Sequence, residues 1–334
     1  MAGPSPSLAD LLSRAIARRR PLIDGGTTEA YRVFSGEVDG VDGLFIDVYG
    51  PGAVLIVYEG RPPRWFDESR EAHTILQTLQ PLGVKAIYLK PFAKDRSKMG
   101  GELPAIVTQP APLAGEPLAE FVTVREHDWQ LEVRFYDGLS TGLFLDQRDN
   151  RKFVADSVKR FKGTPAVLNT FAYTCAFSVA AAKHGAATTS VDVSVRYLDW
   201  GRRNFVHNAI DPADHRFAKM DTFEFFGYAQ RKGLRYDLIV LDPPSFASGN
   251  KRKGIRPWSS ASDYARLVHG AADLLKPGGT IFASTNTQQL CLPGRLEREI
   301  TKGLGRSVRY LDLPAPPLDF ARDQDRIAAL AFKP

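Results

Sequence analysis

The chain has 334 residues, 43% of them hydrophobic, which is enough to bury a full α/β core and leave residues for a second, smaller domain. Its apolar runs are far shorter than the ~20 residues of a membrane-spanning helix, and the N-terminus lacks the apolar core of a secretory signal. The formal charge is +6, and the only two cysteines, Cys175 and Cys291, disfavour a disulfide framework or a metal site and fit a reducing cytoplasm.

The first 120 residues predict a helical segment followed by a small α+β domain. Residues 1–30 contain an amphipathic stretch from Leu8 that predicts a surface helix. Residues 31–120 hold closely spaced glycines and β-prone pieces, with turns expected at Asp39-Gly40 and Asp42-Gly43. The expected elements are the strands Tyr31–Phe34, Gly43–Val48, Ala53–Tyr58 and Ala86–Leu89 and the helix Glu68–Leu79. The proline-rich stretch Pro104–Pro117 predicts a linker or lid.

Residues 121–334 predict a larger α/β domain. Val122–Val133 favours a hairpin that leads into it, and from Ala166 short apolar runs alternate with helical stretches, as in a parallel sheet covered by helices. The expected strands are Ala166–Asn169, Thr188–Asp192, His215–Ala218, Tyr236–Leu241, Thr280–Ala283, Arg309–Leu313 and Ile327–Phe332. The expected helices are Phe177–Lys183, Phe223–Arg231 and Asp263–Leu275, with a break at Lys276-Pro277-Gly278-Gly279. The fold class is therefore α/β, with a seven-stranded Rossmann-like sheet.

Polar residues follow the first two of these strands, at the edge where open α/β sheets bind ligands. The first strand runs into a turn of small and aromatic residues, Asn169–Phe177, which lacks the G-x-G-x-x-G pattern of a dinucleotide site. Asp192 ends the second strand 23 residues after Asn169, close to the spacing of about 20 for a carboxylate that accepts from ribose hydroxyls. The alternative is that Asp192 only caps the helix at Val193-Ser194.

Carboxylates also follow the third and fourth strands. Asp221 can accept from an adenine amino group. Asp242 opens the segment Asp242-Pro243-Pro244-Ser245-Phe246, whose two prolines restrict the loop so that backbone carbonyls are expected to point into the cleft. The alternative, that the prolines only end a strand, leaves the recurrence of carboxylates after three strands unexplained.

Five motifs together resemble a known family, the bacterial large-subunit ribosomal-RNA methyltransferases that make 5-methylcytosine or 7-methylguanine. The motifs are Gly36–Asp47, Thr141–Arg148, Leu168–Phe177, Ser190–Asn208 and Asp237–Phe246. The resemblance covers about Tyr31 to Phe332. It implies that residues 121–334 form a class I methyltransferase domain that uses S-adenosylmethionine.

The resemblance also implies a cofactor site. It assigns the ribose to Asp192, the adenine to Asp221, and the methionine part to the turn shaped by Phe171 and Tyr173. The full set of expected cofactor contacts is Gln147, Arg148, Asn169, Phe171, Tyr173, Thr174, Asp192, Ser194, Asp221 and Asp242. An alternative for the segment around Gln147 and Arg148 is a helix start capped by Asp146. The turn departs from the family pattern at Cys175, where glycine is usual.

The end of the fifth strand decides between the two family activities. Methylation at carbon five of cytosine needs a thiolate that adds to the ring, and family members with that activity carry a cysteine here, where this chain has Ser284-Thr285-Asn286. Neither Cys175 nor Cys291 is suitably placed. A base nitrogen needs only alignment with the methyl group, so methylation of a guanine nitrogen is expected. The expected catalytic residues are Asp242, Pro243, Pro244, Phe246 and Asn286, with Phe246 stacking on the base and Asn286 either orienting it or only closing a loop.

The expected partner is RNA, either 23S ribosomal RNA or its precursor. Most family members have an RNA-binding module before the small sheet domain, whereas about thirty residues precede it here, so clustered basic residues are expected to dock the RNA. These are Lys159, Arg160 and Lys162; Arg202 and Arg203; and Lys251, Arg252, Lys253 and Arg256. The alternatives are a methyltransferase for a small molecule or protein and, with less support, a nicotinamide-dependent oxidoreductase.

Overall fold

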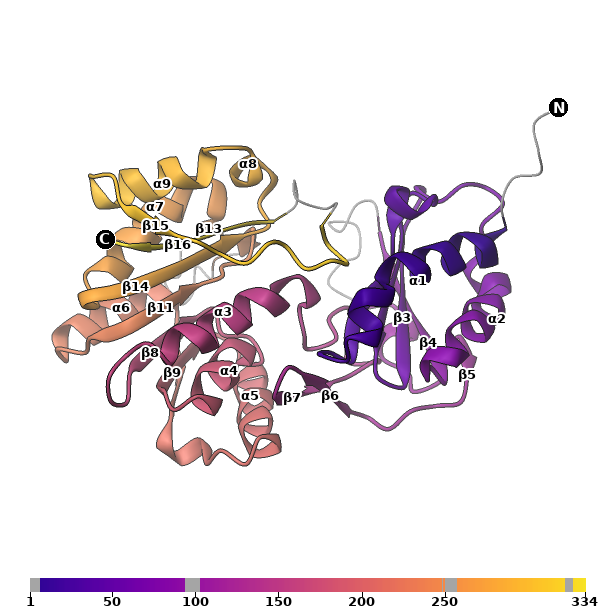
Figure 1. Ribbon diagram of the computed structural model, residues 1–334, viewed down its shortest axis with the longest axis horizontal. Coiled ribbons are helices and arrows are strands. Elements are labelled where there is room, and N and C mark those ends of the chain that lie inside the picture. Colours follow the sequence, from indigo (N-terminus) through magenta and orange to yellow (C-terminus); the bar gives the residue numbers. More distant parts are fainter. Residues whose placement is uncertain (1–6, 94–102, 248, 250–256, 322–326) are drawn as a thin grey trace. The chain divides into compact units, whose positions relative to one another are not determined.

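A computed structural model describes residues 7–93, 103–247, 249, 257–321 and 327–334. Their contacts divide the chain into two compact units (Figure 1), Met1–Leu145 with Pro317–Arg322 and Asp146–Pro316 with Asp323–Pro334. The hairpin predicted as the start of the larger domain thus groups with the first unit. The functional boundary at residue 120 stays a prediction. Within the part of the chain that is described, no helix is long and apolar enough to cross a membrane.

The first unit is built on a five-stranded sheet with the order β1-β2-β3-β4-β5. Neighbouring strands are antiparallel except β3 and β4, which α2 connects as a parallel pair. The elements are α1 Leu8–Asp24, β1 Ala30–Ser35, η1 Gly36–Asp39, β2 Leu44–Tyr49, β3 Gly52–Tyr58, α2 Glu68–Leu79, η2 Gln80–Leu82, β4 Ala86–Phe92, η4 Ala105–Val107 and β5 Ala114–Gly115. The predicted strands and both predicted helices are confirmed. Apolar residues of α1 and α2 pack on one face of this sheet in a single core.

The stretch Pro104–Pro117 is more than the predicted linker, because it contributes η4 and the edge strand β5. Leu113 donates its backbone N–H to the carbonyl of Ile87 (2.7 Å). The prolines do not occupy this donor position, so they do not prevent pairing at an edge. The hairpin was predicted with its observed limits, since β6 spans Val122–Glu126 and β7 spans Trp129–Val133.

Among the described residues, the second unit holds a seven-stranded sheet with the order β10-β9-β8-β11-β14-β16-β15, which confirms the predicted fold class. Of these strands, β16 runs antiparallel to the other six, and the pairs among β8, β9, β10, β11 and β14 are all parallel. The strands are β8 Ala166–Thr170, β9 Ala187–Asp192, β10 Arg216–Lys219, β11 Tyr236–Leu241, β14 Leu275–Thr285, β15 Arg309–Leu311 and β16 Ala328–Lys333, and a small separate hairpin joins β12 Phe246–Ala247 to β13 Trp258–Ser259. The helices are η5 Leu145–Gln147, α3 Arg148–Val158, α4 Ala176–Lys183, α5 Val195–His207, η6 Pro212–Asp214, α6 Thr222–Arg231, α7 Ser260–Ala272, α8 Gln288–Cys291 and α9 Arg295–Leu304.

Alternate residues of the central strands face two separate cores. Val167, Leu238 and Val240 pack against α3 and α4, whereas Leu168, Ile239 and Leu241 pack against α6, α7 and α9. Figure 1 shows α3 and α4 on one side of the strands and α7 and α9 on the other. Burial on both faces is why β11 reads as a continuous apolar run.

The predicted break before the fifth strand is wrong, because β14 already begins at Leu275. The ladder with β11 pairs Tyr236 with Leu275 and then Leu238 with Thr280, so the four residues between form a bulge. Gly278 adopts a positive φ of 76°, which glycine tolerates, and Lys276 contacts Asp237 on β11 (2.7 Å). The glycine-proline cluster therefore lies inside the strand as a bulge, and the preceding helix ends at Ala272, three residues before the predicted end at Leu275.

Candidate active site

The candidate site lies where strand order reverses. β8 is flanked by β9 on one side and β11 on the other, and connections leave these strands in opposite directions. This is the switch point at which open α/β sheets form a crevice beyond the carboxyl ends of their strands. The turn after β8, Asp192 at the end of β9 and Asp242 after β11 lie at this edge.

The turn after β8 is strained. Phe171, Tyr173 and Cys175 all have positive φ angles (52°, 49° and 62°), a conformation that costs roughly 1–3 kcal/mol for each residue that is not glycine. Surrounding contacts hold it, since Asn204 donates to the Thr174 carbonyl (2.9 Å). Cys175, where the resemblance led us to expect glycine, thus takes a left-handed conformation that glycine adopts without strain.

Gly201 on α5 makes room for Cys175. A Cβ atom on Gly201 would lie 2.4 Å from the cysteine Sγ. We expect Gly201→Ala to lower the free energy of unfolding by about 1–3 kcal/mol through overpacking. Combining it with Cys175→Gly should recover part of this loss. Urea denaturation of both variants measures the effect.

Gly227→Ala is the matched control, because a Cβ atom there meets only the tip of Arg231 at 3.3 Å. It should be neutral or slightly stabilising, since alanine favours a helix over glycine. Equal losses for Gly201→Ala and Gly227→Ala would contradict the packing explanation.

Asp192 joins the strained turn to α5. Its Oδ2 accepts the backbone N–H of Tyr173 (2.9 Å) and its Oδ1 that of Ser194 (2.8 Å). Burial raises the pKa of the Asp192 carboxyl, although these N–H groups lower it. Asp192 is not the cap of the helix, because Ser194 is the N-cap residue and accepts from Tyr197. The backbone N–H of Val193 also lowers the pKa of Asp192, and three N–H donors still leave the carboxylate, with about four lone-pair sites, able to accept from a hydroxyl.

The other predicted cofactor residues differ in how they are placed. Asp221 caps α6, where its Oδ1 accepts from Phe223 (2.9 Å) and Glu224 (3.3 Å). Asn169 is 2% exposed and donates to Ser178 (3.0 Å), so its side chain is committed to the protein interior. Thr174 is also buried. These two residues can approach a ligand only through their backbone.

Asp242 is held by partners that sequence reasoning did not identify. Its Oδ1 accepts from Ser284 Oγ (2.6 Å) and from Gln147 Nε2 (3.1 Å). Gln147 is fixed in turn by Asn150, whose Nδ2 donates to its Oε1 (2.8 Å). Within the described residues no hydrogen bond reaches Oδ2, so this oxygen remains available to a ligand.

The charge state of Asp242 is set by its surroundings. Burial raises the pKa of the Asp242 carboxyl to about 6, while the bond from Ser284 lowers it, Asp146 raises it and Arg151 lowers it. The carboxyl is thus ionised at neutral pH. The expected helix start is present, because α3 begins at Arg148, but its N-cap position is Gln147, which makes no side-chain capping bond, and not Asp146. Arg148 is buried.

The loop after Asp242 corrects one expectation. The carbonyl of Pro244 does not face an open cleft, because it accepts from Trp258 Nε1 (2.8 Å) and Ser260 Oγ (2.9 Å). Pro243 is buried beside it. Phe246 is 66% exposed, as a stacking role requires. Asn286 is exposed, and its Oδ1 accepts from Ser245 Oγ (2.6 Å), which leaves its NH₂ group as a donor.

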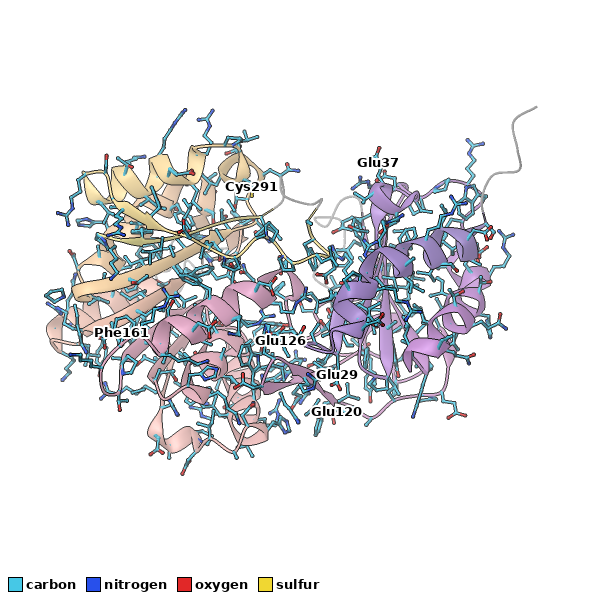
Figure 2. All side chains as sticks on the ribbon, viewed as in Figure 1. Glu29, Glu37, Glu120, Glu126, Phe161 and Cys291 are labelled. Atoms are coloured by element: carbon cyan, nitrogen blue, oxygen red, sulfur yellow. The ribbon has the colours of Figure 1, made fainter. Side chains whose placement is uncertain are left out.

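Both cysteines are engaged away from Asp242. Cys175 is fully buried, and burial raises the pKa of its thiol to about 12. Cys291 lies at the end of α8 (Figure 2) and its Sγ donates to the carbonyl of Thr285 (3.5 Å). The position on β14 that touches Asp242 is a serine hydroxyl, Ser284, and serine is a poor nucleophile at its ordinary pKa.

The structure describes only some of the predicted basic clusters. Lys159 pairs with Asp156 (3.2 Å), and Arg202 pairs with Asp199 (2.7 Å) and stacks on Phe217 (4.5 Å). The cluster Lys251, Arg252, Lys253 and Arg256 lies outside the described residues. In the described ranges no three His, Cys, Asp or Glu residues gather as metal ligands do.

Comparison with known proteins identifies relatives along most of the chain. The profile of S-adenosylmethionine-dependent methyltransferases matches residues 108–331. YwbD from Bacillus subtilis is 38% identical over 83% of this chain and 65% of its own length, so the match spans less than two thirds of that relative. Ribosomal RNA large subunit methyltransferase K from Neisseria meningitidis is 33% identical over 87% of this chain and 77% of its own length. The crystal structure of SMU.776 complexed with SAH has a TM-score of 0.80 and 30% identity, covering 99% of this chain and 83% of that one.

Proposed function

This chain belongs to the family of S-adenosylmethionine-dependent methyltransferases, and from that premise we propose that it methylates a base nitrogen, with guanine favoured, in large-subunit ribosomal RNA. The site residues fit the cofactor. A carboxylate with free lone pairs, a strained turn and a helix start follow successive strands. Asp192 would hold the ribose, the Phe171–Cys175 turn the methionine part, and Asp221 the adenine. The bound cofactor supplies a methyl group activated by a sulfonium centre.

The hydrogen bond from Ser284 to Asp242 (2.6 Å) is the observation that favours methylation of a nitrogen over methylation of carbon five. A carbon-five methylation of cytosine requires a nucleophile that adds to the ring. Here a hydroxyl bonded to a carboxylate occupies that position, and both thiols are engaged elsewhere. A nitrogen with a lone pair needs only alignment and a polar environment, which a fixed carboxylate and amide provide.

Three side chains would read the base. Asp242 Oδ2 can accept from ring or exocyclic N–H groups, and the Asn286 NH₂ group can donate to a carbonyl oxygen. Guanine offers both, with N–H donors beside the O6 acceptor. Phe246 would stack on a base that has left its helix. Adenine lacks the carbonyl, which is why guanine is favoured.

The proposal of ribosomal RNA rests on the relatives. The Neisseria protein is named for that substrate, and a protein of Deinococcus radiodurans with the name ribosomal RNA large subunit methyltransferase is 32% identical over 82% of this chain. The net charge of +6 suits a polyanionic partner. No specific observation among the residues that the structure describes favours a small molecule or a protein instead.

The test is methyl transfer from radiolabelled S-adenosylmethionine to total RNA from a strain that lacks the gene, followed by nucleoside mass spectrometry. Label in a methylguanosine is the expected result. Label in 5-methylcytidine would overturn the argument from Ser284. Intact SAH binding with no label in RNA would overturn the RNA substrate.

Asn286 provides a sharper test of base selection. Asn286→Asp replaces the NH₂ donor by a second acceptor that faces the base carbonyl, and we expect kcat/KM to fall by about 100-fold. Asn286→Ala removes the donor without adding repulsion and should cost less. Steady-state assays of the two variants on the unmodified form of the RNA that wild type methylates compare them. A tolerated Asn286→Asp would mean that Asn286 only closes its loop.

A further inference from the structure

The carbonyl of Pro244 is bound by two side chains from the segment that follows the loop. Trp258 on β13 and Ser260 at the start of α7 both donate to it, at 2.8 and 2.9 Å. A carbonyl oxygen has two lone pairs, so both are used. Ser260 also donates its backbone N–H to the carbonyl of Ser245 (3.1 Å). Successive peptide groups after Asp242 are thus held from one side.

The ring of Trp258 links the same loop to the cofactor side. It is 6% exposed and lies 5.8 Å from the ring of Phe171, in the strained turn, and 5.9 Å from the ring of Phe223. The backbone N–H of Phe223 is bonded by Asp221. One side chain therefore contacts elements that follow β8, β10 and β11.

The hairpin of β12 and β13 fixes the position of Phe246 relative to Trp258. Ala247 pairs with Trp258 and Phe246 pairs with Ser259. Neighbouring residues of a strand point to opposite sides, so the buried Trp258 and the exposed Phe246 face different ways. Fixing the indole inside the protein directs Phe246 outward.

From these contacts we infer that Trp258, together with Ser260, is a positioning residue for methyl transfer. The two donors hold the Pro244 carbonyl inward, which leaves Asp242 Oδ2 as the acceptor offered to the target base. The indole ring of Trp258, which packs against Phe171, also holds this loop in a fixed position relative to the turn after β8. The inference rests on the proposed role of Asp242.

We call Trp258, Ser260 and the Pro244 carbonyl that they bind the clamp. Because two side chains donate to one carbonyl, the single and double variants should differ in transfer rate in a characteristic way. In Trp258→Phe the ring contacts remain and Ser260 still satisfies the carbonyl, and in Ser260→Ala the indole still does. We expect each single variant to lower the single-turnover rate by about 3-fold. The double variant leaves the partly buried Pro244 carbonyl without either side-chain donor and frees the loop, so we expect a loss of about 100-fold, far beyond the product of the singles.

The experiment compares this double variant with Trp129→Phe/Ser262→Ala. Trp129 also donates its indole N–H to a side chain, that of Glu126 (3.2 Å), and Ser262 is an exposed residue of α7. Single-turnover transfer to an unmodified 23S ribosomal RNA transcript, SAH affinity and hydrogen exchange of residues 242–247 are measured for both. The expected result is slow transfer and at least about 10-fold faster exchange in the clamp variant alone, with SAH affinity retained.

Exchange needs no RNA, so it separates the clamp from the proposed function. Unchanged exchange of residues 242–247 in the clamp variant would overturn the inference even if the wild-type protein methylates RNA. Equal rate losses in both double variants, or a loss confined to SAH affinity, would also overturn it. A loosened loop in a protein inactive on this transcript would support the clamp and count against the proposed substrate.

Discussion

Replacing Asp242 by asparagine is expected to lower the rate of methyl transfer by about 1,000-fold or more while SAH affinity stays within a few-fold of wild type. The substitution keeps an acceptor for Ser284 and Gln147, which bind Oδ1, but it removes the charge and turns Oδ2 into a donor. A fixed acceptor aimed at the reacting base is worth several kcal/mol in a water-poor site. Single-turnover transfer and calorimetric titration with SAH measure the two quantities.

Asp237→Asn is the matched control, because Asp237 lies at the opposite end of β11 and pairs with Lys276 (2.7 Å). It should retain transfer per folded molecule even if it costs stability. If Asp242→Asn instead transfers methyl groups at the wild-type rate, the base-reading site lies elsewhere on the sheet.

The pH dependence of wild type and of Asp242→Asn follows from the raised pKa of Asp242. Because the ionised carboxylate accepts from the base, wild-type transfer should fall as pH drops below about 6. The free energy of unfolding depends on pH in the opposite direction from the transfer rate. A folded-state pKa above the ordinary value of 3.8 means that the protonated form contributes stability below pH 4, which is lost as pH rises through about 6. Asp242→Asn should therefore be about 1–2 kcal/mol more stable than wild type at pH 7 and similar at pH 4.

The sequence predicted the regular elements well wherever local pattern decides them. The limits of β11 and α2 and the hairpin of β6 and β7 agree with the prediction, since apolar runs, periodicity and turn residues are local properties. Two stretches rich in proline and glycine were misjudged. In each, pairing with a neighbouring strand, Ile87 to Ala114 or Tyr236 to Leu275, overrides the local tendency to break.

The sequence could predict only those residues of the candidate site whose side-chain type indicates their chemical role. Carboxylates after successive strands could be located by counting, and Asp192, Asp221 and Asp242 do end or follow their strands. The contacts that fix them could not. Gln147 and Ser284 lie 95 and 42 residues from Asp242 in sequence, and the direction of the Pro244 carbonyl depends on Trp258. Such contacts exist only once the sheet has formed.

Replacing Asp192 by asparagine is expected to weaken SAH binding by about 100-fold. Its carboxylate accepts the backbone N–H groups of Tyr173 and Ser194 and interacts with that of Val193, and it keeps the capacity to accept from a ribose hydroxyl. Asparagine keeps one acceptor and no charge, so charge-assisted bonds worth about 1.5–3 kcal/mol are lost. Calorimetric titration measures the affinity. Asp199→Asn, which breaks only the exposed pair with Arg202 on the same helix, should bind SAH normally.

A loss in Asp192→Asn has two sources, direct contact with the ribose and slackening of the turn that Tyr173 anchors. The 2′-deoxy analogue of SAH separates them. If the carboxylate binds the hydroxyls, wild type should discriminate between SAH and the analogue by about 10-fold or more, and Asp192→Asn should lose most of that discrimination. If instead the variant weakens both ligands equally, Asp192 acts only by holding the strained residues Phe171, Tyr173 and Cys175 in place, and the ribose is bound by other groups.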